Sequence, residues 1–193
     1  MYKKGGAVMS GVMWLVIGVI VFIFAFIIIV YNRLIVLKIR TNEAWAQIDV
    51  QLKKRNDLVP NLVETVKGYA AHEKAVFENV TKARAMMQSA GSDVGKVIEA
   101  NNLLTGALKS LFAVVENYPE LKANQNFLNL QMELTGIEEK IAYARQFYNE
   151  TVRMYNEYQQ KFPGVLFAGV FGHTTRNYFE IEESEKKAPQ VKF

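Results

Sequence analysis

The sequence predicts an all-α protein in which a single N-terminal transmembrane helix continues into an elongated antiparallel bundle of long helices. Charged side chains are missing from residue 7 to residue 31. Beyond that run, apolar residues recur at alternating spacings of three and four, as on the buried face of a helix. Strand signals are weak, and four prolines without a long Gly/Ser tract provide no flexible linker.

The first expected element is a transmembrane helix over residues 7–31, after a short tail over residues 1–6. The run exceeds the ~20 residues that a helix needs to cross a membrane. It is also longer than the apolar part of a cleaved signal peptide, and it ends in "FIIIVYNRL" rather than in a cleavage site. Gly11, Gly18 and Ala25 recur every seven residues, which predicts a face on which a second membrane helix packs closely.

The basic residues beside this run predict its orientation. Lys3 and Lys4 precede it, whereas Arg33, Lys38 and Arg40 follow it. Because lysine and arginine favour the cytoplasmic side, the count leans towards a cytoplasmic C-terminal domain. The net charge of +4 is typical of a surface beside anionic lipid headgroups. No nucleic-acid-binding motif accompanies it, so nucleic acid is not an expected partner.

The second element is a long helix that leaves the membrane and is kinked at Pro60. Proline removes one backbone hydrogen bond, here the one to the carbonyl of Asn56, but a kinked helix survives where packing offsets the loss. The stripe keeps its phase through Pro60, so one bent helix is expected to reach about residue 89. The stripe consists of Trp45, Ile48, Leu52, Arg55, Val59, Leu62, Val66, Tyr69, Glu73, Val76, Val80, Ala83 and Met87.

Two further helices are expected in the bundle domain, which spans residues 32–180. One begins after Ser92 or Asp93, either of which is a good N-cap, and its stripe consists of Val94, Val97, Asn101, Leu104, Leu108, Leu111, Val115 and Tyr118. The other is expected over residues 120–162, after Pro119 and before Pro163. Its stripe consists of Phe127, Leu130, Leu134, Ile137, Ile141, Ala144, Tyr148, Thr151, Tyr155, Tyr158 and Phe162.

The segment after Pro163 has a different composition. The apolar patch Val165–Phe171, including Leu166, Phe167 and Phe171, either folds back onto the bundle or contacts a membrane or a partner. Residues 181–193 are expected to form a charged, disordered tail.

Charged residues on the buried stripe need partners. Arg55 and Glu73 are each expected to meet an opposite charge on another helix, or to lie where the stripe is exposed. Together with Lys53 and Lys54, Arg55 also forms a basic cluster, which is a candidate contact for lipid or a partner protein.

The sequence predicts no catalytic centre, no metal site and no cofactor. His72-Glu73 resembles part of a helical zinc-protease motif, but the second histidine is missing because position 76 is Val76. There is no cysteine to act as a nucleophile or thiolate ligand. The carboxylate pairs Glu138-Glu139 and Glu182-Glu183 are interpreted as solvated surface, since neighbouring residues on a helix point in different directions.

Two long segments resemble bacterial LemA proteins. The first is "YNRLIVLKIRTNEAWAQIDVQLKKRNDLVPNLVETVKGYAAHE", with "AR" at Ala83-Arg84, and the second is "LFAVVENYPELKANQNFLNLQMELTGIEEKIAYARQFYNETVRMYN", with "FP" at Phe162-Pro163. The resemblance implies a single-pass protein of the bacterial inner or plasma membrane with a helical-bundle domain and no assigned enzymatic activity. It also implies links to magnetosome membrane formation and to membrane-protease genes.

We therefore expect a non-enzymatic, membrane-anchored scaffold or adaptor in envelope organisation or membrane-protein quality control. Its expected partners are the lipid bilayer, further copies of the chain, and another membrane protein or a membrane protease complex. One alternative is a membrane-remodelling protein whose apolar patch contacts lipid. A less favoured alternative is a metal-dependent hydrolase that uses His72, Glu73 and His173.

Overall fold

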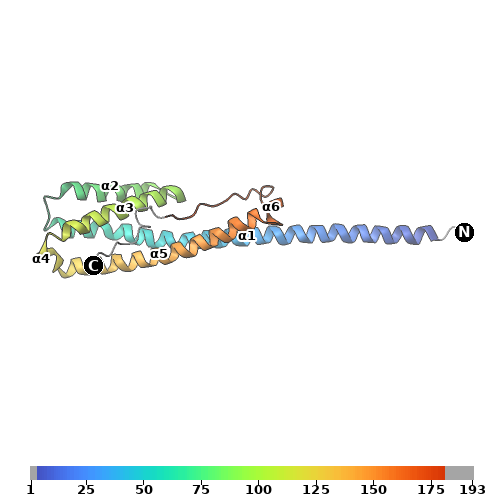
Figure 1. Cartoon of the computed structure of the whole chain (residues 1–193), viewed down its shortest axis with the longest axis horizontal. Helices are drawn as coiled ribbons and strands as arrows, with labels where there is room; N and C mark the ends of the chain where they lie inside the picture. The colour runs from blue at the N-terminus through green and yellow to red at the C-terminus, as the bar shows by residue number, and fades with distance from the viewer. Residues whose placement is uncertain (1–3, 181–193) are drawn as a thin grey trace, which may run out of the picture. The chain divides into compact units, whose positions relative to one another are not determined.

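The computed structural model describes residues 4–180, and its regular secondary structure there is entirely α-helical (Figure 1). No strand occurs among these residues, which confirms the all-α prediction. The expected tail over residues 181–193, with Glu182-Glu183, lies outside the described residues, as does the first half of the expected tail over residues 1–6.

The chain divides into two compact units. Among the described residues, the first unit contains residues 4–42 together with Thr151–Arg176. The second unit contains Glu43–Glu150 together with residues 177–180. Two long helices, α1 (Lys4–Lys67) and α5 (Gln125–Gln160), contribute residues to both units.

The first unit contains the apolar part of α1. Within residues 4–180, α1 is the one helix long and apolar enough to cross a membrane. Its most apolar part has a mean hydropathy of 3.2, and none of that part is buried inside the protein. The end of α5 and the short helix α6 (Gly164–Phe167) complete the unit, where Val30, Leu34 and Ala168 form a small buried cluster.

The second unit is an up-and-down helical bundle. It consists of the C-terminal part of α1, then α2 (Lys74–Ser89), α3 (Val94–Val115), α4 (Pro119–Lys122) and most of α5. Figure 1 shows α2 and α3 side by side and running in opposite directions, which their short connection requires. Its core consists of Val59, Leu62, Val63, Val66, Ala70, Phe77, Val80, Ala83, Leu104, Leu108, Leu111, Val115, Leu121, Phe127 and Leu134.

The prediction of one helix that reaches about residue 89 is wrong. The first helix runs without interruption through Pro60 but ends at Lys67, and α2 begins only at Lys74. Gly68 follows the last helical residue, a position where helices commonly end. The predicted stripe nevertheless continues into α2, where Val80 and Ala83 are buried, whereas Tyr69 in the break is exposed.

The prediction for α3 is confirmed, including its start. Asp93 is the N-cap, and its side-chain carboxylate accepts hydrogen bonds from the backbone N–H groups of Gly95 and Lys96 at 3.0 and 3.2 Å. These bonds satisfy two of the backbone donors that a helix start leaves without partners.

The helix expected over residues 120–162 is divided in two. Pro119 does begin a helix, but that helix is the single turn α4, and the Asn124 side chain then caps α5 by accepting from the backbone N–H groups of Asn126 and Phe127. The end of the predicted stripe is also wrong. Phe162 lies beyond the end of α5 at Gln160, and its side chain is 73% exposed.

Candidate functional site

A buried arginine is the main polar feature of the second unit. The Arg55 side chain is 2% exposed and forms an ion pair with Glu138 Oε1 at 2.8 Å. It also donates to Asn101 Oδ1 at 2.9 Å and to the Thr105 hydroxyl at 3.0 Å. The prediction that Arg55 meets an opposite charge on another helix is therefore confirmed, and α1, α3 and α5 are joined through one guanidinium group.

The partners of Arg55 and Glu73 change the interpretation of two carboxylates. Glu138 was interpreted as solvated surface, but its carboxylate turns towards Arg55, while 45% of its side chain stays exposed. Glu73 follows neither alternative, because it is half-buried before the start of α2 and its printed partner is the Tyr118 hydroxyl, from which it accepts a long hydrogen bond of 3.5 Å. Sequence spacing could not show which of Glu138 and Glu139 pairs with Arg55, because both lie near the edge of the buried stripe.

The carbonyl that Pro60 leaves without its helical donor has a different partner. Arg84 of α2 donates its Nε–H to the Asn56 carbonyl oxygen at 3.2 Å. A proline at this position removes the N–H group that would have bonded to that oxygen. An arginine side chain from a neighbouring helix thus replaces a backbone donor, which explains how α1 continues through Pro60. The expected bend of the helix at Pro60 stays a prediction.

We expect the Arg84 contact to depend on Pro60. Replacing Arg84 by methionine should lower the free energy of unfolding by about 1.5–3 kcal/mol, the range for a hydrogen bond to a charged group. In a Pro60→Ala background the cost should be clearly smaller, because alanine restores the backbone donor to Asn56. Urea unfolding of the four variants in detergent measures this coupling. Equal costs in both backgrounds would show that Arg84 does not replace the missing donor.

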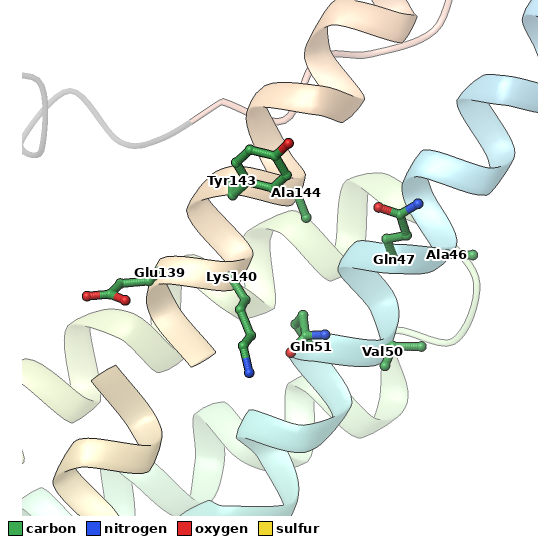
Figure 2. A pocket seen from close by; sticks show the side chains of 8 residues that line it. All are labelled: Ala46, Gln47, Val50, Gln51, Glu139, Lys140, Tyr143 and Ala144. Atoms are coloured by element: carbon green, nitrogen blue, oxygen red, sulfur yellow. The ribbon is translucent and has the colours of Figure 1, made fainter. Parts of the chain in front are cut away.

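A groove runs between α1 and α5 of the second unit (Figure 2). One wall is formed by Ala46, Gln47, Val50 and Gln51 of α1, and the other by Glu139, Lys140, Tyr143 and Ala144 of α5. The Gln51 side-chain oxygen is buried in this wall and has no hydrogen-bond partner among residues 4–180. Such a group is costly to leave unpaired.

Large apolar side chains are exposed on the two helices that form this groove. Met132, Tyr143 and Phe147 of α5 are 63%, 74% and 47% exposed, and Val50 of α1 is 50% exposed. On α5 these side chains recur at helical spacing through Gly136, where an added Cβ would meet no atom within 4 Å. We call this surface, Val50 with Met132, Gly136, Tyr143 and Phe147, the outer stripe. Helix α5 thus has one apolar stripe in the core and a second one facing outward.

Asparagine side chains hold the extended segment that follows His173. In the first unit, Asn156 donates to the Arg176 carbonyl and accepts from its N–H, both at 2.9 Å. In the second unit, Asn149 forms the same pair of bonds with Phe179, at 3.0 and 2.8 Å. Asn149 and Asn156 lie seven residues apart on α5, on its buried side. Each provides hydrogen-bond partners for the backbone N–H and C=O groups of one residue in a segment that has no strand partner. Sequence reasoning missed these contacts.

His173 is a buried titratable group in the first unit. Its Nδ1 lies 2.8 Å from the Tyr155 hydroxyl, and the residue is 7% exposed. Burial, and secondarily the charge of Lys38, lower the pKa of His173 below its ordinary value of 6.5. Burial likewise raises the pKa of Tyr155, which the charge of Arg176 partly offsets.

We expect the first unit to lose stability in mild acid because of His173. The unfolded chain binds the proton at about pH 6.5, whereas the folded chain binds it only at lower pH. The stabilisation is therefore complete above that pH and is lost as the pH falls towards the lowered pKa. Thermal unfolding between about pH 7.5 and pH 5.5 should show a decrease that His173→Gln removes. A decrease of the same size in His173→Gln would rule out His173 as its source.

The structure gives no support for a metal centre. His72 belongs to the second unit and is exposed, whereas His173 is buried in the first unit. Within the part of the chain that the structure describes, no three His, Cys, Asp or Glu side chains lie together as metal ligands would.

The other predicted site residues lie on the surface. Gly11, Gly18 and Ala25 are exposed on the apolar part of α1, and an added Cβ at either glycine meets no atom within 4 Å. Lys53 and Lys54 are exposed, whereas the neighbouring Arg55 is buried. Leu166 is exposed, and Phe167 and Phe171 are half-buried against α1. Helix packing at the small residues, and lipid or partner contact at the others, stay predictions.

Comparison with known proteins links the chain to a described family. Residues 44–193 match the family described as "LemA family". Two similar relatives are Magnetosome protein MamQ 2 and Magnetosome protein MamQ 1 of Paramagnetospirillum magneticum, each 25% identical over an alignment of 190 residues that covers 86% of this chain and 70% of the relative. Magnetosome protein MamQ of Magnetospirillum gryphiswaldense is 25% identical over an alignment of 174 residues that covers 77% of this chain and 64% of the relative.

Proposed function

Because the chain belongs to the LemA family, we propose that it is a non-enzymatic, membrane-anchored scaffold that assembles with further copies of itself. The apolar part of α1 is the membrane anchor, and the second unit is the assembly domain. The similarity to proteins named for the magnetosome supports a role in envelope organisation. Membrane-protein quality control, with a membrane protease complex as partner, is the second setting in which such a scaffold would act.

The outer stripe is the observation that supports assembly most directly. Isolated apolar residues are normal on a surface, but several large ones at helical spacing beside a groove are typical of an interface. Tyrosine, phenylalanine and methionine are also the residue types enriched at interfaces. A helix of a second copy laid along the groove would cover Tyr143 and Phe147.

The charges of the groove favour a second copy as the occupant. Glu139 and Lys140 both line it and have opposite signs. In a two-fold dimer the same surface meets itself in reverse, so Glu139 of each copy faces Lys140 of the other when the α5 helices cross near these residues. The groove is thus complementary in charge to itself.

We expect Tyr143→Glu to break this assembly. A carboxylate in a closed apolar interface is costly to desolvate, so self-association should weaken at least tenfold, which corresponds to ~1.4 kcal/mol. Light scattering of the detergent-solubilised full chain should then show a smaller complex than for the unchanged protein. The matched control is Leu103→Glu, which places the same charge at another exposed apolar residue, on α3. If both variants assemble like the unchanged chain, the outer stripe is not the interface.

We also propose that the second unit lies in the cytoplasm, as the basic residues Arg33, Lys38 and Arg40 after the apolar run favour. Because the chain has no cysteine, a single Leu103→Cys variant, at an exposed residue of α3 outside the outer stripe, reports the topology. A membrane-impermeant thiol reagent should label it only after spheroplasts are opened. Labelling of intact spheroplasts would reverse the proposed orientation.

A further inference from the structure

The turn after α5 has an unusual composition for a solvent-exposed corner. Residues 162–172 contain no charged side chain, and they include three phenylalanines, two valines and a leucine. We call this segment, with α6 at its centre, the apolar corner. It belongs to the first unit, together with the apolar part of α1.

One side of the apolar corner packs on α1. The Phe167 ring lies 6.4 Å from the Phe26 ring, and the Phe171 ring lies 5.0 Å from the Tyr31 ring, both edge to face. Ala168 is buried in a cluster with Val30 and Leu34, against which Phe26, Phe167 and Phe171 pack. Phe26 and Tyr31 both belong to the charge-free run over residues 7–31. The apolar corner therefore lies beside the part of α1 that would enter the membrane.

The other side of the apolar corner is exposed. Phe162, Val165, Leu166 and Val170 are 73%, 52%, 59% and 78% exposed. Covering them would bury large apolar side chains, each worth about 1.5–3 kcal/mol when fully removed from water. No other part of the first unit covers them among residues 4–180, although the same segment packs its remaining side chains well.

The distance along α1 matches the depth of an interfacial segment. Phe26 lies five residues before Tyr31, which corresponds to about 7 Å along a helix. Apolar faces of segments that lie in the membrane surface are buried by about 5–10 Å. If Tyr31 marks the end of the hydrocarbon region, then Phe167 and its neighbours reach that depth without any rearrangement of the first unit.

Basic residues follow the apolar run of α1 and flank the apolar corner in the sequence. Arg33, Lys38 and Arg40 follow the charge-free run of α1, and residues 32–42 contain no acidic side chain. Lys161 precedes the apolar corner and Arg176 follows it, and Glu157 is the one acidic residue between Thr151 and Arg176. Each basic residue near an anionic membrane surface contributes about 1 kcal/mol of attraction.

We propose that the apolar corner inserts into the surface of the bilayer beside the transmembrane helix, as a second membrane contact that fixes the first unit against anionic lipid. This inference rests on the proposed membrane anchor, because an apolar corner beside α1 reaches lipid only if α1 is in the membrane. This second membrane contact would have an effect that the transmembrane helix alone does not have. A single helix can rotate and tilt, whereas two contacts hold the first unit in one orientation at the surface.

Single cysteines in the full chain test this proposal, since the chain has none of its own. Leu166→Cys, Val170→Cys and two reference variants, Ile20→Cys in the apolar run and Leu103→Cys on α3, would each carry an environment-sensitive fluorophore. The proteins are reconstituted in vesicles of equal parts phosphatidylcholine and phosphatidylglycerol. Lipids brominated near the glycerol or deep in the acyl chain report depth, and aqueous iodide reports exposure.

The proposal predicts that the labels at Leu166 and Val170 lose most of their emission to shallow brominated lipid and little to iodide. The label at Leu103 should show the opposite pattern, and the label at Ile20 should respond to deep lipid. If Ile20 responds but Leu166 and Val170 behave like Leu103, or are shielded from both quenchers by protein, the apolar corner is not in the bilayer. If Ile20 itself does not respond to lipid, the membrane anchor is wrong and the proposal falls with it.

Discussion

Replacing Glu138 by leucine is expected to lower the free energy of unfolding of the second unit by about 3 kcal/mol. The reason is the asymmetry of the ion pair, in which Arg55 is 2% exposed and Glu138 is 45% exposed. Removing the accessible partner takes away the carboxylate that lies 2.8 Å from a guanidinium group in the core. The expected loss of stability is at the lower end of the range for breaking a buried ion pair, because Asn101 and Thr105 still accept hydrogen bonds from Arg55.

Two further variants separate charge from packing. Glu139→Leu makes the same change at the exposed neighbouring residue and should alter stability by less than about 0.5 kcal/mol. The double variant Arg55→Met with Glu138→Leu removes both charges at similar volume and should recover most of the loss. Urea unfolding can be followed by Trp45, which is near Tyr148 in the core, in a Trp14→Phe background. If Glu138→Leu costs no more than Glu139→Leu, the ion pair does not stabilise the core.

Replacing Gly164 by alanine is expected to displace the apolar corner. A Cβ at this position would overlap the Tyr158 carbonyl oxygen and would lie 2.9 Å from its carbon, both atoms of the backbone. Because backbone atoms cannot rotate away as a flexible side chain does, the cost should reach the upper end for overpacking, about 3 kcal/mol. Hydrogen exchange in peptides covering residues 158–173 should then accelerate roughly a hundredfold.

Gly169→Ala is the matched control for this change. It adds the same methyl group to the same segment, at a glycine where a Cβ meets no atom within 4 Å. Exchange in this variant should stay close to that of the unchanged chain. Equal acceleration in both variants would mean that the close approach of Gly164 to Tyr158 does not hold the apolar corner in place.

The sequence was sufficient to predict the helices whose burial follows one regular stripe. On α3 the buried residues Val97, Leu104 and Leu111 repeat every seven residues, and Asp93 supplies a local start signal. The helix ends inside longer stripes were not predictable in the same way. Apolar spacing continues across Gly68 and Asn124, so only the glycine and the asparagine cap marked these helix ends. The prediction followed the apolar spacing and therefore missed both ends.

The candidate site was less predictable because its contacts join distant parts of the sequence. The need of Arg55 for a partner followed from its place on a buried stripe, but its choice of Glu138 over other acidic residues depends on how α1 and α5 pack. The missing donor at Asn56 followed from Pro60, whereas Arg84 as its replacement required the position of α2. Exposure of Tyr143 and Phe147 on the outside of a helix with a buried stripe also required the bundle.

The mass of the complex formed by the full chain tests the central claim most directly. The protein would be extracted from membranes at near-native level in mild detergent, and the protein part of the particle would be weighed by light scattering. The proposed scaffold predicts a mass that is a multiple of the 22.0 kDa chain, with or without a co-purifying membrane protein. A uniform particle containing one chain and no reproducible partner would contradict it.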